Sequence, residues 1–199
     1  MLRVGVLALQ GGVIEHVQAT RSAAHRLKLN CEVSEIKTKK EVKGLDGIII
    51  PGGESTTLQK LLEREAMFDD VKRVPAVFGT CAGAILLAKR ITDAAPGQKT
   101  LELMDFEAQR NAYGTQNESF EETIATPMGR MNAVFIRAPR ITRVGKNAGI
   151  LAKINGDCVA CEQKTGTTFY LATTFHPELS EARDALFHER FLKETSALI

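Results

Sequence analysis

The chain has 199 residues, of which 44% are hydrophobic and 25% charged, and its formal net charge is +2. This composition is ordinary for a globular protein, and so small a net charge argues against a nucleic-acid partner. The start shows no signal-peptide pattern, and no apolar stretch approaches the roughly 18 residues of a membrane span. We therefore expect one cytoplasmic domain over residues 1–199, with no membrane partner.

The first ninety residues alternate between strand and helix patterns. Short apolar runs predict strands, and apolar residues at helical spacing predict helices. We predict strands at 2–9, 31–36, 47–50 and 75–78, and helices at 13–27, 55–64 and 82–89. The basic segment 37–43 is interpreted as a solvated connection. Alternation of this kind predicts an α/β fold whose parallel sheet is covered on both faces.

After Pro96 the pattern changes to strands separated by turns. We predict strands at 102–109, 120–126, 133–137, 149–154, 159–163 and 168–174, followed by a helix at 180–195. Strands that follow one another without helices favour antiparallel additions to the parallel sheet.

Four cysteines in a chain of this length are too few for a secreted disulfide scaffold. Cys158 and Cys161 form a C-x-x-C pair within a strand-like run. Residues three apart on a strand point to opposite faces, so we expect these thiols not to converge on a metal. We interpret the pair as structural.

The strongest chemical signal is Gly79-Thr80-Cys81-Ala82-Gly83, which lies between an apolar strand and a predicted helix. This is the cysteine form of the nucleophile elbow. The flanking glycines are needed because the turn from strand to helix leaves no room for a β-carbon, and the nucleophile takes a strained conformation. Cys81 at the helix start favours a thiolate, and the N–H of Ala82 is placed to bind an oxyanion.

The second signal is Phe175-His176-Pro177-Glu178. A cysteine nucleophile needs a base, and the base needs an orienting carboxylate. Pro177 biases His176 toward extended backbone, where residues two apart point the same way. We therefore expect His176 and Glu178 to stand side by side at the end of the strand 168–174.

The third signal is Pro51-Gly52-Gly53-Glu54-Ser55, which follows the strand 47–50. Ligands of open α/β sheets bind at the carboxyl ends of strands, and glycines let backbone N–H groups approach them. We expect a second oxyanion donor here, although a Pro-Gly-Gly turn alone is a weak signal. His16, His25 and His188 fall on predicted helices and are interpreted as ordinary helix residues, with His16 close to the mouth of the site.

These three motifs, in this order, resemble the class I (triad) glutamine amidotransferases. Further segments are similar to the glutaminase subunits of pyridoxal 5′-phosphate synthase. They are Ala8-Leu9-Gln10-Gly11, Glu15-His16, Gly53-Glu54-Ser55-Thr56-Thr57, Arg110-Asn111-Ala112-Tyr113-Gly114, Ser119-Phe120-Glu121, Phe135-Ile136-Arg137-Ala138-Pro139 and His176-Pro177-Glu178-Leu179. The resemblance implies a three-layer, flavodoxin-like fold whose central sheet is mostly parallel with antiparallel additions.

The resemblance implies that a Cys81–His176–Glu178 triad hydrolyses L-glutamine to L-glutamate and ammonia, without a cofactor or a metal. It places backbone N–H groups of Gly53 and Ala82 at the oxyanion. Residues implied to hold the glutamine are Gly52, Gly53, Glu54, Arg110, Ile136 and Arg137. A guanidinium suits the substrate α-carboxylate, which is the expected use of Arg110; for Arg137 a surface salt bridge remains an alternative.

The family also implies a partner, a (β/α)₈-barrel synthase subunit that receives the ammonia, in a complex with twelve copies of each subunit. This sequence departs from the family pattern at Gly12, where an acidic residue is common, at Glu102, where glycine is usual, and at Thr115, where arginine is usual. The segment between Met67 and Pro75 is also short. We expect these departures to bear on docking and on access to the site, since none lies in the triad.

Three alternatives stay open at this point. The first is a glutaminase that serves another pathway, such as histidine or purine synthesis. The second is a DJ-1-like hydrolase or glyoxalase, which also carries an elbow cysteine but lacks this His-x-Glu arrangement. The third is a regulatory subunit without activity, against which the intact Cys81, His176 and Glu178 argue.

Overall fold

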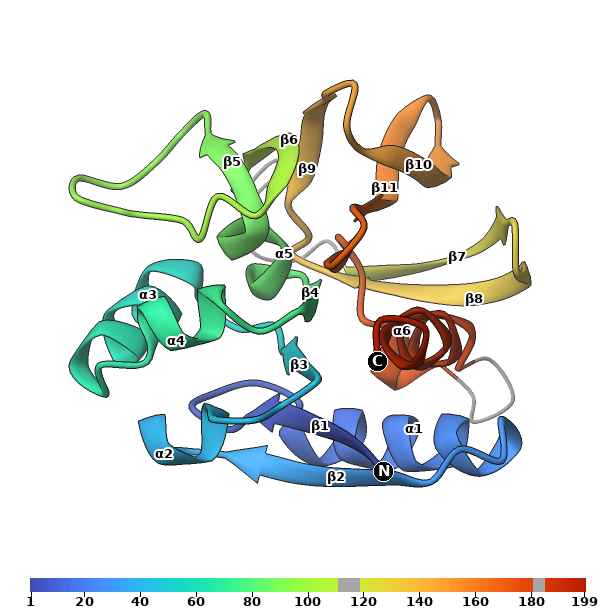
Figure 1. Ribbon diagram of the computed structural model, residues 1–199. Coiled ribbons are helices and arrows are strands. Elements are labelled where there is room, and N and C mark those ends of the chain that lie inside the picture. The colour runs from blue at the N-terminus through green and yellow to red at the C-terminus, as the bar shows by residue number, and fades with distance from the viewer. Residues whose placement is uncertain (111–118, 181–184) are drawn as a thin grey trace.

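A sheet of ten strands organises the parts of the chain that the computed structural model describes, which are residues 1–110, 119–180 and 185–199 (Figure 1). The strands lie in the order β2-β1-β3-β4-β12-β11-β9-β6-β5, and β10 pairs with β11. Their bounds are β1 (Leu2–Leu7), β2 (Cys31–Ile36), β3 (Gly47–Ile50), β4 (Ala76–Thr80), β5 (Ala88–Ile91), β6 (Met104–Gln109), β9 (Arg140–Val144), β10 (Gly149–Ile154), β11 (Asp157–Lys164) and β12 (Phe169–Thr173). A separate hairpin joins β7 (Ser119–Thr126) and β8 (Gly129–Ile136).

The pairing directions divide the sheet into two parts. Strands β2, β1, β3, β4 and β12 run parallel to one another. Strand β11 is antiparallel to β12, β10 and β9, and β9 is antiparallel to β6. The structure therefore confirms the predicted α/β class, with a parallel centre and antiparallel additions.

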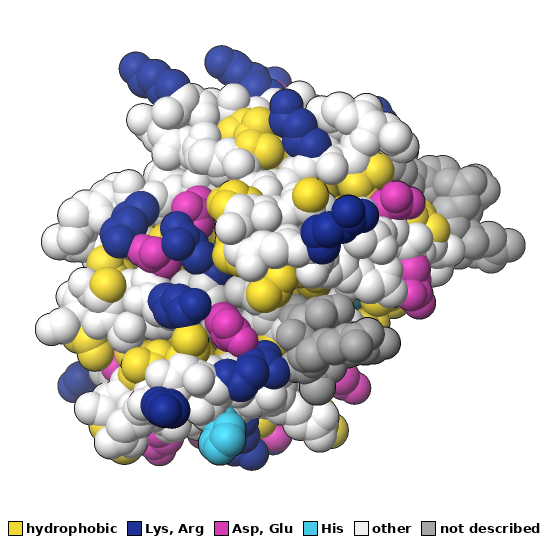
Figure 2. Space-filling model, turned by 90° about the vertical axis from the view of Figure 1, so that its right-hand side faces the viewer, with side chains coloured by type: hydrophobic (Ala, Val, Ile, Leu, Met, Phe, Trp, Pro, Cys, Tyr) yellow, Lys and Arg dark blue, Asp and Glu magenta, His cyan; other side chains and the backbone are white. Residues whose placement is uncertain are grey.

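Helices cover both faces of the parallel strands (Figure 1). Along β3, Ile48 and Ile50 enter one apolar cluster and Ile49 enters the other, as the twofold period of a strand requires. One cluster packs under α2 (Lys39–Val42), α3 (Ser55–Arg64), α4 (Phe68–Lys72) and α5 (Ala82–Leu87). The other packs under α1 (Val13–Arg26), α6 (Leu186–Ser196) and the β7–β8 hairpin. Figure 2 shows basic and acidic side chains interspersed on the molecule's surface, seen at right angles to the view of Figure 1.

The structure corrects several predicted boundaries. The first strand ends at Leu7 rather than at residue 9, and the helix predicted at 82–89 ends at Leu87. The helix predicted at 180–195 begins at Leu186, with residues 181–184 outside the described part. Four elements were missed: α2, α4, β5 and β9. The segment 37–43 was wrongly interpreted as a connection, because Thr38 and Glu41 form a capping box that begins α2. Residues 88 and 89 were predicted to continue a helix, but they belong to strand β5 because this segment pairs with β6.

Cys158 and Cys161 were predicted to point to opposite faces of their strand, and this was wrong; their interpretation as structural residues stays a prediction. Both side chains enter the same apolar cluster, whereas Val159 and Ala160 between them enter the other. The pairing of β10 with β11 changes register here, so that one extra residue of β11 lies between Cys158 and Ala160. A hydrogen bond between the two thiols lowers the pKa of Cys158 and raises that of Cys161.

Candidate active site

A pocket of about 380 Å³ lies where three central strands end. Strands β3, β4 and β12 are adjacent and parallel, and each is followed directly by one of the three motifs. Their carboxyl ends therefore bring the motifs to one edge of the sheet. The pocket is lined by Gly11, Gly12, Gly52, Gly53, Glu54, Ser55, Cys81, Ala82, Ile85, Arg110, Ile136, Arg137, Pro139 and His176.

Cys81 lies between β4 and α5 with φ 49° and ψ −107°. This backbone conformation is strained for a residue with a β-carbon, and the Cys81 N–H donates to the Thr173 carbonyl at 2.9 Å. The flanking glycines are required sterically. A β-carbon on Gly79 would lie 2.5 Å from the backbone of Gly83, and one on Gly83 would lie 2.0 Å from the Ile50 carbonyl oxygen. Tight packing against β3 thus holds the nucleophile at the pocket.

His176 and Glu178 are brought together beside Cys81. The His176 Nδ1 lies 2.7 Å from Glu178 Oε1, and the His176 and Cys81 side chains both lie against Gly52 in the pocket. The expected pairing is present, but the expected reason is wrong. Strand β12 ends at Thr173, and Pro177–Leu179 forms a 3₁₀ turn that directs both side chains to the same place.

The environment of His176 favours its protonated form. Burial opposes the charge, but hydrogen bonds with Cys81 and Glu178 and the negative charges of both groups raise the pKa of His176 to about 10. An imidazolium next to Cys81 stabilises the thiolate, which is the nucleophilic form of cysteine. The arrangement is therefore suited to attack on a carbonyl carbon.

The glycine loop continues into the start of α3. The Glu54 carboxylate caps this helix by accepting from the N–H groups of Thr56 at 3.0 Å and Thr57 at 2.6 Å. Burial opposes ionisation, but these bonds lower the pKa of Glu54 overall. Gln10 donates to the Glu54 carbonyl at 2.9 Å and packs against Gly53, which has φ +135°. The loop is therefore tied to the end of β1.

Arg110 reaches this loop from β6. Its Nη2 lies 3.4 Å from Glu54 Oε1, and its Nη1 donates to Gln98 Oε1 at 2.8 Å. Ile136 and Arg137 line the pocket from the end of β8, where Arg137 is exposed and has φ 44°. The rest of the Arg110-Asn111-Ala112-Tyr113-Gly114 segment lies outside the described residues, as does Thr115.

Sequence reasoning missed a polar cluster behind the pocket. His16, Thr80 and His188 are fully buried next to Glu178. A signal was present for His16, because it shares a stripe of helical spacing with the buried Thr20 and Ala23 of α1. Gln98, the partner of Arg110, carried no such signal.

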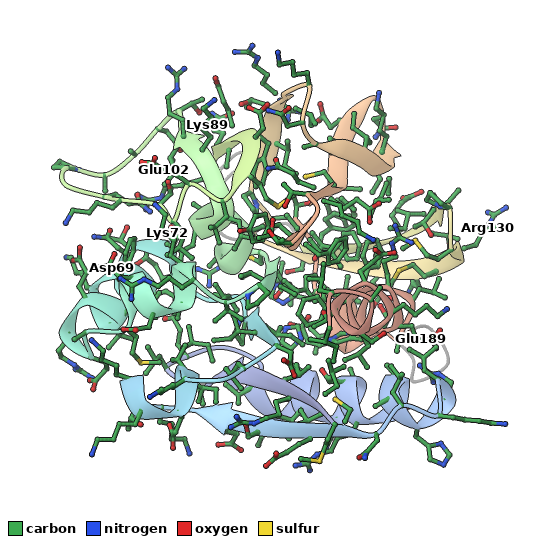
Figure 3. All side chains as sticks on the ribbon, viewed as in Figure 1. Asp69, Lys72, Lys89, Glu102, Arg130 and Glu189 are labelled. Carbon is green, nitrogen blue, oxygen red and sulfur yellow. The ribbon has the colours of Figure 1, made fainter. Side chains whose placement is uncertain are left out.

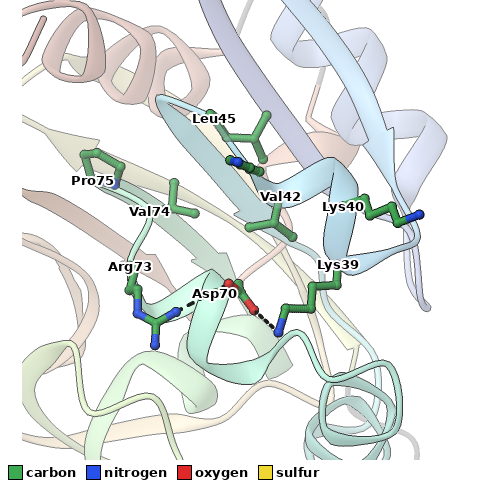
Figure 4. Close-up of a pocket in the computed structure, with 10 residues that line it drawn as sticks. Lys39, Lys40, Val42, Leu45, Asp70, Arg73, Val74 and Pro75 are labelled. Atoms are coloured by element: carbon green, nitrogen blue, oxygen red, sulfur yellow. Dashed lines mark hydrogen bonds and ion pairs between the residues drawn. The ribbon is translucent and has the colours of Figure 1, made fainter.

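A second hollow, of about 580 Å³, lies at the opposite edge of the sheet, where the chain enters β3 and β4 (Figure 4). Its apolar floor includes Val42 and Leu45, and Asp70 on its wall pairs with Lys39 at 3.2 Å and with Arg73 at 3.4 Å. It is larger than the pocket at Cys81, but its lining contains no nucleophile or base arranged for catalysis. We therefore assign the chemistry to the smaller pocket.

The described residues were also considered for a metal centre and for a membrane-spanning helix. Within the part of the chain that the structure describes, no group of three or more His, Cys, Asp or Glu side chains could hold a metal ion. In the same ranges, no helix is long and apolar enough to cross a membrane.

Comparison with known proteins identifies the family. Residues 6–197 match the model of the SNO glutamine amidotransferase family. The chain is 41% identical to the "Pyridoxal 5′-phosphate synthase subunit PdxT" of Pyrococcus horikoshii, over 97% of this chain and 99% of that protein. It is 44% identical to the PdxT of Korarchaeum cryptofilum, over 97% and 98%.

Solved structures agree with this result. A crystal structure of a glutamine amidotransferase superposes with a TM-score of 0.82 at 40% identity, over 97% of this chain and 98% of that chain. A protein of Thermoplasma acidophilum described as a putative GMP synthase subunit shares the fold at 16% identity, with a TM-score of 0.62 over 99% and 95%. The predicted fold class is thereby confirmed, and the chain belongs to the SNO glutamine amidotransferase family.

Proposed function

We propose that this chain is the glutaminase subunit of a pyridoxal 5′-phosphate synthase and hydrolyses L-glutamine to L-glutamate and ammonia. One observation carries the proposal: Cys81, on a strained elbow, shares the pocket with His176, which is held in turn by Glu178. Nucleophile, base and orienting carboxylate in this relation are the requirement for acyl transfer through a thioester.

In the proposed reaction the Cys81 thiolate attacks the side-chain carboxamide carbon of glutamine. The carbon–nitrogen bond breaks as His176 Nε2 gives its proton to the leaving ammonia, which leaves a thioester on Cys81. Water then loses a proton to His176 and attacks the thioester, which releases glutamate and restores the thiolate. Glu178 orients the imidazole through Nδ1, at the 2.7 Å contact already described.

The pocket supplies the remaining groups. N–H groups of Gly53 and Ala82, both in the lining, are proposed to bind the oxyanion. Arg110 is proposed to pair with the α-carboxylate of glutamine, since Gln98 and Glu54 hold its guanidinium at the rim. Gly52, Ile136 and Arg137 complete the substrate contacts from the facing segments.

The proposed partner is the synthase subunit of the same enzyme, because the relatives are named as subunits of pyridoxal 5′-phosphate synthase. We propose that it is a (β/α)₈ barrel, that it takes up the ammonia, and that twelve copies of each subunit assemble. The alternative pathway assignments, histidine or purine synthesis, predict instead that a different synthase stimulates the enzyme.

Glutamate release from glutamine tests the proposal. We expect activity that rises strongly when a pyridoxal 5′-phosphate synthase barrel is added, and a loss of about a thousandfold or more in Cys81→Ala. Cys31→Ala, a half-buried cysteine on β2, is the matched control and should keep its activity. Activity that does not change when the barrel is added would overturn the proposed partner. If no glutamate forms under any condition, the inactive regulatory subunit becomes the better interpretation.

A further inference from the structure

A buried chain of polar groups continues beyond Glu178, away from the pocket. Glu178 Oε1 contacts His176, and its second oxygen, Oε2, lies 3.2 Å from His16 Nε2. His16 Nε2 is also 3.1 Å from the Thr80 hydroxyl. On its other side, His16 Nδ1 lies 3.0 Å from His188 Nε2. Helices α1 and α6 thus place two imidazoles in line behind the carboxylate.

Both imidazoles are neutral in the folded protein. His16 and His188 have no exposed surface, and the Glu178 side chain is only 1% exposed. Burial, with the nearby His188 and His176, holds the pKa of His16 well below its usual range. Burial and the charge of Arg26 lower the pKa of His188 to about 3. Each ring therefore carries one N–H and one lone pair.

The contacts select one arrangement of these protons. If His16 carried its proton on Nδ1, its bare Nε2 would face the Glu178 carboxylate, and lone pair would oppose lone pair. His188 Nε2 would then be the acceptor, which forces its proton onto Nδ1, an atom that has no partner among the described residues. A buried N–H without an acceptor is costly. The opposite arrangement leaves no buried N–H without an acceptor in this cluster: the atoms without a hydrogen bond, His188 Nδ1 and Glu178 Oε2, then carry lone pairs alone.

The direction of the bonds follows. His188 Nε2–H donates to His16 Nδ1, and His16 Nε2–H donates to the Thr80 hydroxyl, with Glu178 Oε2 in contact at 3.2 Å but not hydrogen-bonded. The Glu178 carboxylate then has the His176 ring bonded at Oε1, and the positive N–H edge of His16 in contact with Oε2, an oxygen without a hydrogen bond among the described residues. A buried carboxylate needs such partners to stay charged and fixed in place.

We propose that His16 and His188 are positioning residues, which hold Glu178 from behind and through it fix the tautomer and orientation of His176. His16 acts directly on the carboxylate and His188 fixes the tautomer of His16. The kinetic consequence rests on the glutaminase function proposed above, whereas the proton arrangement and its effect on Cys81 do not.

Three variants of the full chain test the proposal. His16→Leu keeps an apolar volume but removes both nitrogens, and His16→Gln restores an N–H donor at the position of Nε2. His25→Gln changes an exposed histidine of the same helix and is the matched control. Two quantities are measured on each variant: kcat and KM for glutamine with the synthase barrel present, and the rate at which iodoacetamide alkylates Cys81 at pH 7.

We expect His16→Leu to lower kcat on the order of tenfold, as is typical when the group that orients a reacting side chain is removed, with little change in KM. Alkylation of Cys81 should slow to a similar degree, because a loosened His176 stabilises the thiolate less. His16→Gln should recover most of both losses, and His25→Gln should match the wild type. Equal losses in His16→Leu and His16→Gln would reduce His16 to a packing role and overturn the proposal.

Nitrogen-15 NMR of histidine-labelled wild-type protein completes the test. It requires neither catalytic activity nor a substituted protein that still folds. We expect His16 and His188 to be neutral at pH 7 with the proton on Nε2. A proton on Nδ1 of His16 would overturn the proposal. Should the wild type fail to hydrolyse glutamine, the glutaminase function falls, while alkylation and NMR still decide the role of His16.

Discussion

The two edges of the central sheet carry hollows of opposite character. At the carboxyl edge, Cys81 is held in a strained conformation, and charged and polar groups are buried in a connected chain from His176 to His188. At the amino edge, the larger hollow has an apolar floor, and its ion pairs join Asp70 to partially or fully exposed cations. Size alone would select the wrong hollow. Strain together with buried charge marks the chemistry, because such costly features concentrate at functional sites.

The comparison predicts that one carboxylate matters at the carboxyl edge and its counterpart at the amino edge does not. Glu178→Gln should lower the kcat of glutamine hydrolysis by about a thousandfold or more, because an amide no longer stabilises the His176 imidazolium or fixes its tautomer. Asp70→Asn makes the same chemical change in the other hollow and should leave kcat unchanged. Steady-state kinetics with the synthase present would measure kcat of both variants. A large loss of kcat in Asp70→Asn would contradict the assignment of the chemistry to the carboxyl edge.

The buried histidines should also make the carboxyl edge sensitive to acid. Unfolded, His188 takes up a proton as the pH falls through 6.5, whereas folded it stays neutral down to about pH 3. The unfolded state therefore binds more protons in this window, and the contribution to stability is complete above pH 6.5 and lost as the pH falls. His16 acts in the same sense, and His176, with its raised pKa, acts in the opposite one.

The difference between wild type and His188→Leu isolates one of these groups. Between pH 7.5 and 5.5 the wild type should lose about 1 kcal/mol more unfolding free energy than the variant does. Urea unfolding at the two pH values measures this difference. His25→Leu, which removes an exposed histidine, should follow the wild type, and parallel pH profiles for wild type and His188→Leu would contradict the neutral state of His188.

The alternating first half of the fold was readable because its central strands, β3 and β4, are buried on both faces. The run Gly47–Ile50 and the strand before Cys81 are continuous apolar segments, and each lies between punctuating glycines or prolines. The second half was harder, since β5 and β9 exist through pairing with β6 rather than through their own patterns. The bulge that turns Cys158 and Cys161 to one face is likewise a property of two strands together.

The site divides in the same way. The elbow and the His-Pro-Glu segment are local patterns whose spacing implies chemistry, so sequence could place them. The buried cluster of polar side chains behind the pocket contains residues 16, 80, 178 and 188. Only the packing of α1 and α6 against the sheet brings these residues together. Single histidines on predicted helices gave no reason to connect them.

The smallest predicted effect concerns strain outside the site. Glu102, like Cys81, has a positive φ, at 54°, and Figure 3 labels it near the segment that enters β6. A left-handed conformation costs a residue with a β-carbon about 1–2 kcal/mol, and glycine avoids this at an entropic cost of about 0.5–1 kcal/mol. Glu102→Gly should therefore raise the unfolding free energy by roughly 0.5–1 kcal/mol without changing kcat.

Glu102→Ala is the matched control, since it removes the carboxylate but keeps the β-carbon and the strain. If the β-carbon of Glu102 causes the strain, urea unfolding should rank Glu102→Gly above both Glu102→Ala and the wild type. Equal stability of the two variants would mean that the segment relaxes around the β-carbon. At Cys81 a positive φ cannot be relieved in this way, because the residue that bears the strain is also the nucleophile.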